Sequence, residues 1–271
     1  MPSHYTKLLR TTLTASLFLV AIAGAAVAGP FEDAVTAYDN GDYATAIRLL
    51  RPLADQGLAE AQHDLAVMYF EGQGVSRDYA EAMKWFRLAA AQGNAQAQYN
   101  VGLMYARGQG VAPDYGQAIA WYRKAADQGN AKGQFGLGWM YGNGLGVPQS
   151  YVEAMKWFRL AGDQGDAEAQ RNLGLMYAQG QGVPQDYAQA AKWFRLAADQ
   201  GLGDAQINLG VMYAQGRGVA QDYVRAHLWF NLAAMQGDQG AARNRDMAER
   251  LMTLAQIAEA QKLAREWKPK R

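Results

Sequence analysis

The sequence predicts an all-α fold, a solenoid of antiparallel helix pairs, and three observations support this prediction. Tryptophan recurs every 36 residues, at Trp85, Trp121, Trp157, Trp193 and Trp229. A Met-Tyr pair keeps the same step from Met68-Tyr69 to Met212-Tyr213, and a glutamine keeps it from Gln62 to Gln206. Each unit also contains two stretches of helical periodicity separated by glycine. A constant period of about 20 to 50 residues is the signature of repeat architectures.

The fourth copy, residues 166–201, shows how the first or A helix of each unit is specified. Asp166 precedes the helix, where its carboxylate can accept a hydrogen bond from an unpaired N–H of the first turn. Four apolar side chains then fall on one helical face: Ala169, Leu173, Met176 and Tyr177. Gly180 and Gly182 are expected to end this helix, because glycine adopts positive φ without a steric penalty.

The second or B helix of the same copy is expected to start near Asp186. Its apolar face consists of Tyr187, Ala190, Phe194, Ala197 and Ala198. The A helices carry glycine in their interiors, at Gly102, Gly138, Gly174 and Gly210. Glycine there costs up to about 1 kcal/mol relative to alanine, so its recurrence predicts a close approach of neighbouring helices.

The two ends of the repeat array differ from its middle, as the ends of solenoids do. We divide the chain into a signal peptide (1–28), an N-terminal capping unit with a short turn (29–57), five repeats (58–237) and C-terminal capping helices (238–271). Thr253 and Gln256 match a capping box before the last helix. The apolar face of that helix comprises Ile257, Ala260, Ala264 and Trp267, and we expect it to dock on the last repeat.

Residues 1–28 have the three parts of a secretory signal peptide. Lys7 and Arg10 form a positive start, Leu13 to Ala23 is almost entirely apolar, and Ala26-Val27-Ala28 offers a cleavage site after Ala28. An uncleaved anchor is the alternative, but the apolar stretch is shorter than the roughly 20 residues that a spanning helix needs. We therefore expect no membrane span after cleavage, and a periplasmic or secreted protein of the bacterial envelope.

Charge and composition exclude several classes of function. The formal net charge is +1, and removal of residues 1–28 leaves 24 basic and 25 acidic side chains, a net charge of −1. Such a chain has no cationic surplus for a phosphate backbone, so nucleic acid is not an expected partner. The sequence contains no cysteine, which excludes disulfides and thiolate metal sites.

No catalytic residue, metal site or cofactor is predicted. After cleavage only His63 and His227 remain, in separate repeats, and there is no HExxH or phosphate-binding loop. The glycine-rich turns follow a helix rather than a strand, which does not suit a dinucleotide. A catalytic arrangement formed only in space would not be visible in the sequence.

The recurring columns read A-x-Q-x-x-L-G-x-M-Y-x-x-G-x-G-V-x-x-D-Y-x-x-A-x-x-W-F-x-x-A-A-x-Q-G. They resemble the Sel-one-like repeat, a relative of the tetratricopeptide repeat, over residues 58–237. The resemblance implies a right-handed superhelix with the A helices on its concave side, and a role as an adaptor in complex assembly. A cysteine-rich branch of the family is linked to penicillin binding. Cell-wall-directed or β-lactam-binding activity is therefore the alternative function, although this chain lacks the cysteines.

Constant columns build the fold, whereas variable columns on an exposed face can carry specificity. By its resemblance to tetratricopeptide repeats, the sequence predicts a groove on the A helices that binds an unknown protein or peptide. Its candidate residues are His63, Tyr99, Asn100, Arg107, Phe135, Trp139, Asn143, Arg171, Asn172, Gln179 and Asn208. Tyr99, Phe135 and Trp139 would form an aromatic floor; burial of these rings between helices is the alternative.

The B helices carry a basic column instead, at Arg87, Arg123, Arg159 and Arg195. We interpret this column as a solvated outer face, because acidic side chains at Asp127, Asp163 and Asp199 lie nearby in the sequence and partly cancel its charge. The oligomeric state is not predicted.

Overall fold

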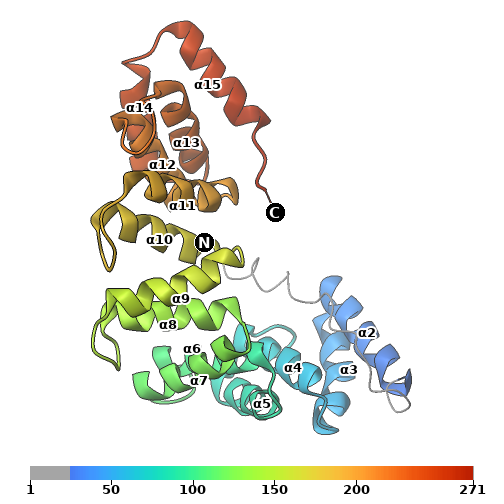
Figure 1. Ribbon diagram of the computed structural model, residues 1–271. Helices are drawn as coiled ribbons and strands as arrows, with labels where there is room; N and C mark the ends of the chain where they lie inside the picture. The colour runs from blue at the N-terminus through green and yellow to red at the C-terminus, as the bar shows by residue number, and fades with distance from the viewer. Residues whose placement is uncertain (1–24, 271) are drawn as a thin grey trace. The chain divides into compact units, whose positions relative to one another are not determined.

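The computed structural model describes residues 25–270, and Figure 1 shows that they form helices joined by short turns. The fourteen helices of this part of the chain are α2 (Ala25–Asp39), α3 (Tyr43–Asp55), α4 (Ala59–Glu71), α5 (Tyr79–Ala91), α6 (Ala95–Arg107), α7 (Tyr115–Asp127), α8 (Ala131–Asn143), α9 (Tyr151–Asp163), α10 (Ala167–Gln179), α11 (Tyr187–Asp199), α12 (Gly203–Gln215), α13 (Tyr223–Met235), α14 (Gln239–Glu249) and α15 (Leu254–Glu266). The positively charged start and the apolar stretch of the predicted signal peptide lie outside the described residues.

The chain divides into two compact units at the boundary between Asp114 and Tyr115. The first unit contains α2–α6 and the second contains α7–α15. Within each unit, consecutive helices pack against one another along the chain, as in a solenoid of helix pairs. The predicted all-α repeat fold is confirmed.

The helices begin and end at the residues that the sequence indicates. The Asp166 carboxylate accepts a hydrogen bond from the Ala169 N–H at 2.8 Å, and Asp186 accepts from the first turn of α11. Gly180 ends α10 in the left-handed conformation, with φ of 69°. At the start of α15, Thr253 and Gln256 exchange both bonds of the predicted capping box.

Most of the repeat tryptophans are core residues. Trp85, Trp157, Trp193 and Trp229 are 4 to 8% exposed. In the second unit, the interior glycines of the A helices lie directly against phenylalanine rings of the B helices. A Cβ atom at Gly138, Gly174 or Gly210 would lie 2.6 to 2.7 Å from the ring of Phe158, Phe194 or Phe230, respectively. The predicted close approach of helices is therefore confirmed.

Gly142, in the last turn of α8, has no such contact. A Cβ atom at Gly142 would meet only the Ala154 Cβ, at an ordinary distance of 3.5 Å. We expect Gly142→Ala to raise the free energy of unfolding by about 0.5 to 1 kcal/mol, because alanine restricts the unfolded chain more than glycine does. Urea unfolding measures the change. Gly138→Ala is the matched comparison in the same helix, and a lower stability of Gly142→Ala than of the wild type would contradict the expectation.

Buried glutamines join successive repeats within each unit. Their exposed fractions are 0 to 6%. The Gln170 Nε2 atom donates to the Gly162 carbonyl at the end of α9, at 2.9 Å, and the Gln170 Oε1 atom accepts from Gln200 at 2.9 Å. Gln206 makes the equivalent pair of bonds, to the Ala198 carbonyl and from Gln236. Each glutamine thus satisfies polar groups on two neighbouring B helices.

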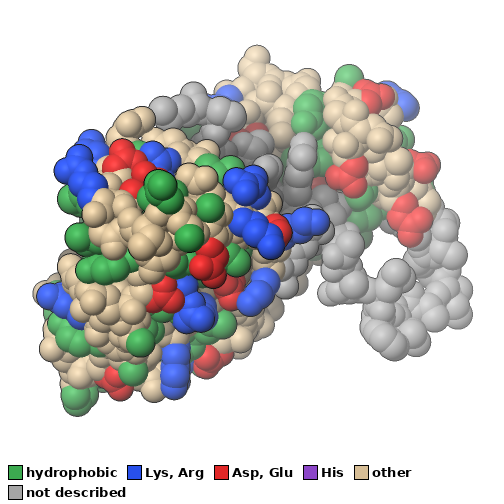
Figure 2. Space-filling model, turned by 90° about the horizontal axis from the view of Figure 1, so that it is seen from above, with side chains coloured by type: hydrophobic (Ala, Val, Ile, Leu, Met, Phe, Trp, Pro, Cys, Tyr) green, Lys and Arg blue, Asp and Glu red, His purple; other side chains and the backbone are tan. Residues whose placement is uncertain are grey.

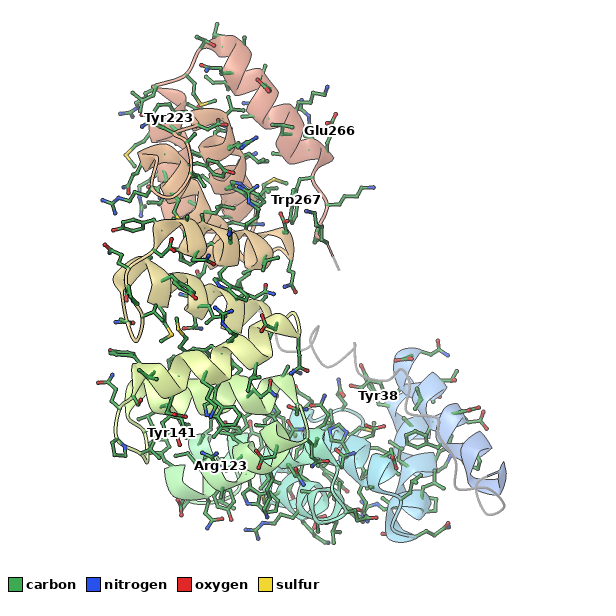
Figure 3. The ribbon with its side chains drawn as sticks, viewed as in Figure 1. Tyr38, Arg123, Tyr141, Tyr223, Glu266 and Trp267 are labelled. Atoms are coloured by element: carbon green, nitrogen blue, oxygen red, sulfur yellow. The ribbon has the colours of Figure 1, made fainter. Side chains whose placement is uncertain are left out.

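The last helix, α15, packs differently from the B helices of the repeats. An A helix pairs closely with the B helix that follows it, but α15 packs against α13 of the last repeat. Ala260 and Ala264 are buried in this contact. Beyond α15, the Trp267 ring lies 6.4 Å from the Trp229 ring (Figure 3), and the Lys270 ammonium pairs with Asp199 at 2.8 Å.

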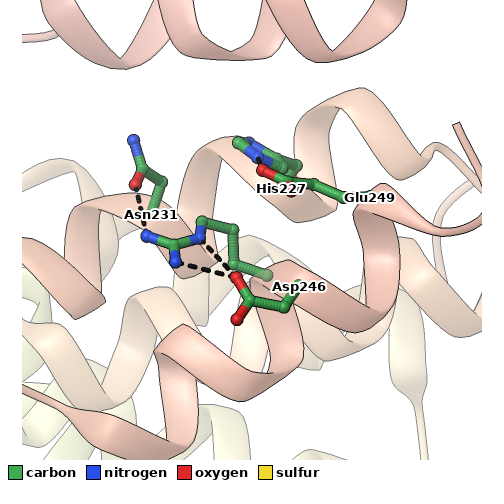
Figure 4. Close-up of polar contacts among 5 residues, drawn as sticks. His227, Asn231, Asp246 and Glu249 are labelled. Atoms are coloured by element: carbon green, nitrogen blue, oxygen red, sulfur yellow. Dashed lines mark hydrogen bonds and ion pairs between the residues drawn. The ribbon is translucent and has the colours of Figure 1, made fainter. Parts of the chain in front are cut away.

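Two polar contacts connect α14 with α13 (Figure 4). The fully buried His227 lies in a column that is apolar in other copies, and its Nε2 atom lies 2.7 Å from the Glu249 carboxylate. Arg245 pairs with Asp246 at 2.7 Å and donates to the Asn231 side chain at 3.3 Å. These contacts tie the first capping helix to the last repeat.

Candidate functional site

The first unit places four of the candidate residues on its A helices. His63 of α4 lies between two polar neighbours, with Nδ1 2.9 Å from Asp64 and Nε2 3.3 Å from the Asn100 amide of α6. Its ring also packs against Phe86 at a centroid distance of 5.6 Å. The other two candidates are Tyr99, which is half-buried, and Arg107, which is exposed at the end of α6.

In the second unit, α8 presents Phe135 and Trp139 differently. Phe135 is half-buried, and its ring packs 5.6 Å from that of Phe158 at the edge of the hydrophobic core. Trp139 is 48% exposed. The Asn143 amide donates to the Trp139 carbonyl at 2.8 Å, and this bond holds the Asn143 side chain against the end of α8. Of the two rings, Trp139 is the one that offers area to a partner.

The next A helix, α10, carries the polar candidates. The Arg171 guanidinium pairs with Asp204 of α12 at 3.1 Å and with Glu168 at 4.0 Å. Its Nε atom is buried and has no hydrogen-bond partner among the described residues. Asn172 donates to the Glu168 carbonyl at 2.8 Å, and Gln179 is exposed. Arg171 therefore bridges two consecutive A helices.

Burial perturbs the charged groups at the N-terminal ends of these A helices. It raises the pKa of the Asp166 carboxyl above its ordinary value, although the Ala169 N–H and Lys132 act in the opposite direction. Burial lowers the pKa of Lys132. The pKa of Glu168 is also raised, first by burial and then by the negative charges of Asp204 and Asp166, against the effect of Arg171.

The raised pKa of Glu168 has a consequence for stability. A carboxyl with a higher pKa in the folded state favours folding at low pH and loses that contribution as pH rises through the folded-state pKa. We therefore expect Glu168→Gln to be more stable than the wild type at neutral pH, with a difference that shrinks in acid as the Glu168 carboxyl of the wild type becomes protonated and neutral, like the glutamine. Urea midpoints across this pH range test the expectation. A difference in stability between Glu168→Gln and the wild type that does not change with pH would contradict the expectation. Glu153→Gln on α9 is the control.

Two shallow pockets open between consecutive A helices of the second unit. Their volumes are about 120 and 220 Å³, and the smaller one includes Asn208. Eight of the nine residues lining one pocket correspond to residues of the other by the 36-residue step. These matched pairs include Leu175 and Val211, Tyr187 and Tyr223, Phe194 and Phe230, and Asn208 and Asn244.

The sequence prediction missed most residues of these pockets. It assigned Tyr187 and Phe194 to the apolar face of the B helix, and it stopped the variable columns at the last repeat. The 36-residue step relates Asn208 to Asn244 and Val211 to Met247, so it could have extended the columns of Asn208 and Val211 to α14. Trp139, Leu175, Val211 and Met247 form one apolar column on the A helices of this unit, and Met247 is 55% exposed.

The arginines of the basic column on the B helices are exposed, as expected, but they also contact side chains of the next repeat. Arg159 donates to the Tyr177 hydroxyl at 2.7 Å and lies 5.5 Å from the Trp193 ring centroid. Arg123 makes the same contacts with Tyr141, at 3.0 Å, and with Trp157 (Figure 3). The interpretation as a merely solvated face was therefore incomplete, because Arg123 and Arg159 each link their B helix to both helices of the next repeat.

Further properties of the described residues bear on function. No helix of residues 25–270 is long and apolar enough to cross a membrane. The same residues contain no group of three or more His, Asp and Glu side chains that could hold a metal ion. On the face shown in Figure 2, basic and acidic side chains are interspersed.

Comparison with known proteins places this geometry in a family. The Sel1 repeat matches residues 59–94, 95–130, 131–166, 167–202 and 203–238. Among proteins of curated function, none matches the chain. The crystal structure of a Sel1 repeat protein from Oxalobacter formigenes is similar, with 34% identity and a TM-score of 0.78, covering 88% of this chain and 100% of that one.

Two immunity proteins from Pseudomonas aeruginosa share the fold at 20% identity. One has a TM-score of 0.54 and covers 83% of this chain and 84% of its own. The other has a TM-score of 0.52, with coverages of 77% and 81%. The five consecutive repeat matches span most of the described helices, and this chain belongs to the Sel1 repeat family.

Proposed function

We propose that this protein is an exported, non-catalytic scaffold that binds a protein or peptide partner on the A-helix face of its repeats. The observation that supports it most is an apolar column on α8, α10, α12 and α14. Its members Trp139 and Met247 are exposed, and Leu175 and Val211 are half-buried beside the two shallow pockets. Exposed apolar surface that is continuous and rimmed by polar side chains marks interaction sites. Sel1 repeats generally serve as scaffolds, which agrees with this proposal.

Export is part of the proposal and rests on residues 1–28. The expected location is the periplasm or the medium, with Gly29 as the first residue of the mature protein. N-terminal sequencing of protein recovered from the periplasmic fraction tests both points. Recovery of protein that still carries Met1 in the membrane fraction would support an uncleaved anchor instead.

Trp139 provides the sharpest test of partner binding. Large aromatic side chains at the centre of an interface contribute about 2 kcal/mol or more, so Trp139→Ala should weaken capture of the partner at least about 30-fold. The measurement is quantitative affinity capture from envelope extract, followed by titration of the recovered protein. Arg171→Ala is a second variant on the same face.

Leu196→Ala is the matched control for Trp139→Ala. Leu196 is also 48% exposed, but it lies on the B helix α11. Circular dichroism must show unchanged helix content in all three variants. If the same proteins are recovered at equal yield with Trp139→Ala and Leu196→Ala, the A-helix face is not the binding site. Saturable labelling by a fluorescent β-lactam would favour the alternative, cell-wall-directed function.

A further inference from the structure

The C-terminal tail, residues 267–270, is bound at the end of a B helix. The Lys270 N–H donates to the Asp199 carbonyl at 2.8 Å, and the Lys270 ammonium pairs with the Asp199 carboxylate at 2.8 Å. The Trp267 ring meets the Trp229 ring edge to face (Figure 3). A Cβ atom at Gly201 would lie 3.7 Å from Trp267. We call Asp199, Gly201 and Trp229 the tail site.

The end of an α-helix attracts such a tail for a physical reason. The last carbonyls of a helix have no partner within the helix, and they carry a partial negative charge. Asp199 is the last residue of α11 and adds a carboxylate to that charge. Lys270 supplies both an N–H donor for the carbonyl and a cation for the carboxylate. Lys268 precedes Pro269, which favours the extended backbone that reaches Asp199.

The 36-residue step reproduces the tail site on earlier repeats of the same unit. The local geometry is repeated as well, because a Cβ atom at Gly162, in the last turn of α9, would lie 3.4 Å from the Trp193 ring. The copies consist of Asp163, Gly165 and Trp193, and of Asp127, Gly129 and Trp157. We call these two copies the open repeat-end sites. The first unit has one more copy, formed by Asp55, Gly57 and Trp85.

The open repeat-end sites have no occupant among residues 25–270. No atom lies within 4 Å of a Cβ atom placed at Gly129 or Gly165. Asp127 and Asp163 are exposed, and neither makes a hydrogen bond or an ion pair through its carboxylate or carbonyl with another described residue. The Asp199 side chain, in contrast, is only 17% exposed. The acceptors that hold the tail are therefore present in these copies and available.

The open repeat-end sites differ from the tail site around the tryptophan. The Arg159 guanidinium lies 5.5 Å from the Trp193 ring centroid, and Arg123 lies at the same distance from Trp157. A planar guanidinium stacks on aromatic rings, so an aromatic side chain that enters an open site can contact the arginine as well as the tryptophan. An aromatic residue and a cation are therefore the groups that complement both parts of each site.

We propose that the open repeat-end sites bind an extended segment of another polypeptide, with an aromatic residue followed three positions later by lysine, as in the chain's own tail. A second copy of this chain is the less favourable occupant. Its tail would have to leave its own tail site, and it would lose the high effective concentration of an attached segment. The inference goes beyond the proposed function, because these sites lie at the ends of B helices and not on the A-helix face.

The experiment titrates the full mature chain, labelled with ¹⁵N, with a synthetic peptide that has the sequence of residues 264–270. We expect the amide signals of Gly57, Gly129 and Gly165 to shift. A peptide with glutamate in place of Lys270 should bind at least about tenfold more weakly, because attraction to the aspartate becomes repulsion. A peptide with alanine in place of Trp267 should bind at least about threefold more weakly.

Asp163→Asn locates the contact. It should weaken binding about three- to tenfold at Gly165 and leave binding at Gly129 unchanged. Gly93 and Gly237 are internal controls, because they follow Ala91 and Met235 where the sites have aspartate. Equal shifts at all these glycines, no binding, or an unchanged affinity of Asp163→Asn at Gly165 would overturn the inference.

Sedimentation of the mature chain tests the identity of the occupant. We expect a monomer with and without the peptide. A dimer that the peptide dissociates would identify the occupant as the tail of a second copy and would overturn the assignment to another polypeptide. None of these outcomes bears on the A-helix face, which Trp139→Ala tests separately.

Discussion

Gly218→Ala is expected to lower the free energy of unfolding by about 3 kcal/mol or more. Gly218 lies in the turn after α12, with φ of +68°, which alone costs a non-glycine residue about 1 to 2 kcal/mol. A Cβ atom there would also overlap the carbonyl group of Tyr187, the first residue of α11. Because that neighbour is helical backbone rather than a side chain, rotation of a flexible group cannot relieve the overlap.

Gly237→Ala separates these two contributions. Gly237 has φ of +98°, but no atom lies within 4 Å of a Cβ placed there. This control should therefore lose only the conformational part, about 1 to 2 kcal/mol. Denaturant unfolding of both variants gives the difference. Equal losses would mean that the turn around Gly218 moves freely, and that its contact with α11 does not stabilise the fold.

Gln206→Leu should have the second largest effect, a loss of about 1 to 3 kcal/mol. The side chain is fully buried and donates to the Ala198 carbonyl at 3.3 Å while accepting from Gln236 at 2.9 Å. Leucine has a similar volume but cannot make either bond, so the Gln236 amide loses one acceptor near the end of α13. Because the volumes are similar, the loss of stability measures the missing hydrogen bonds rather than a cavity.

Gln179→Leu is the appropriate comparison, because Gln179 is exposed on α10. Exposed substitutions usually change stability by no more than about 0.5 kcal/mol. Thermal and urea unfolding should rank Gln206→Leu well below both Gln179→Leu and the wild type. A Gln206→Leu protein of wild-type stability would show that the two hydrogen bonds of Gln206 add no net stability.

The helix boundaries could be predicted because their causes are local. Asp166 and Thr253 bond to N–H groups within three residues, and Gly180 requires only its own backbone freedom. The candidate site was less predictable. Phe135 and Trp139 both occupy variable columns, yet one packs on Phe158 and the other is exposed. Their difference depends on residues of the following helix, which a column of single residues does not reveal.

By itself, the sequence determined the period, the two helices of each unit, their caps and the close approach at the interior glycines, since these follow from hydrogen bonding and side-chain size along one segment. Only the tertiary structure decided how side chains from different repeats combine. Arg159 donates a hydrogen bond to Tyr177, eighteen residues later, and Tyr187 of one repeat lines the same pocket as Asn208 of the next. Such contacts arise when successive helix pairs stack, because stacking brings together side chains that no single helix holds near one another.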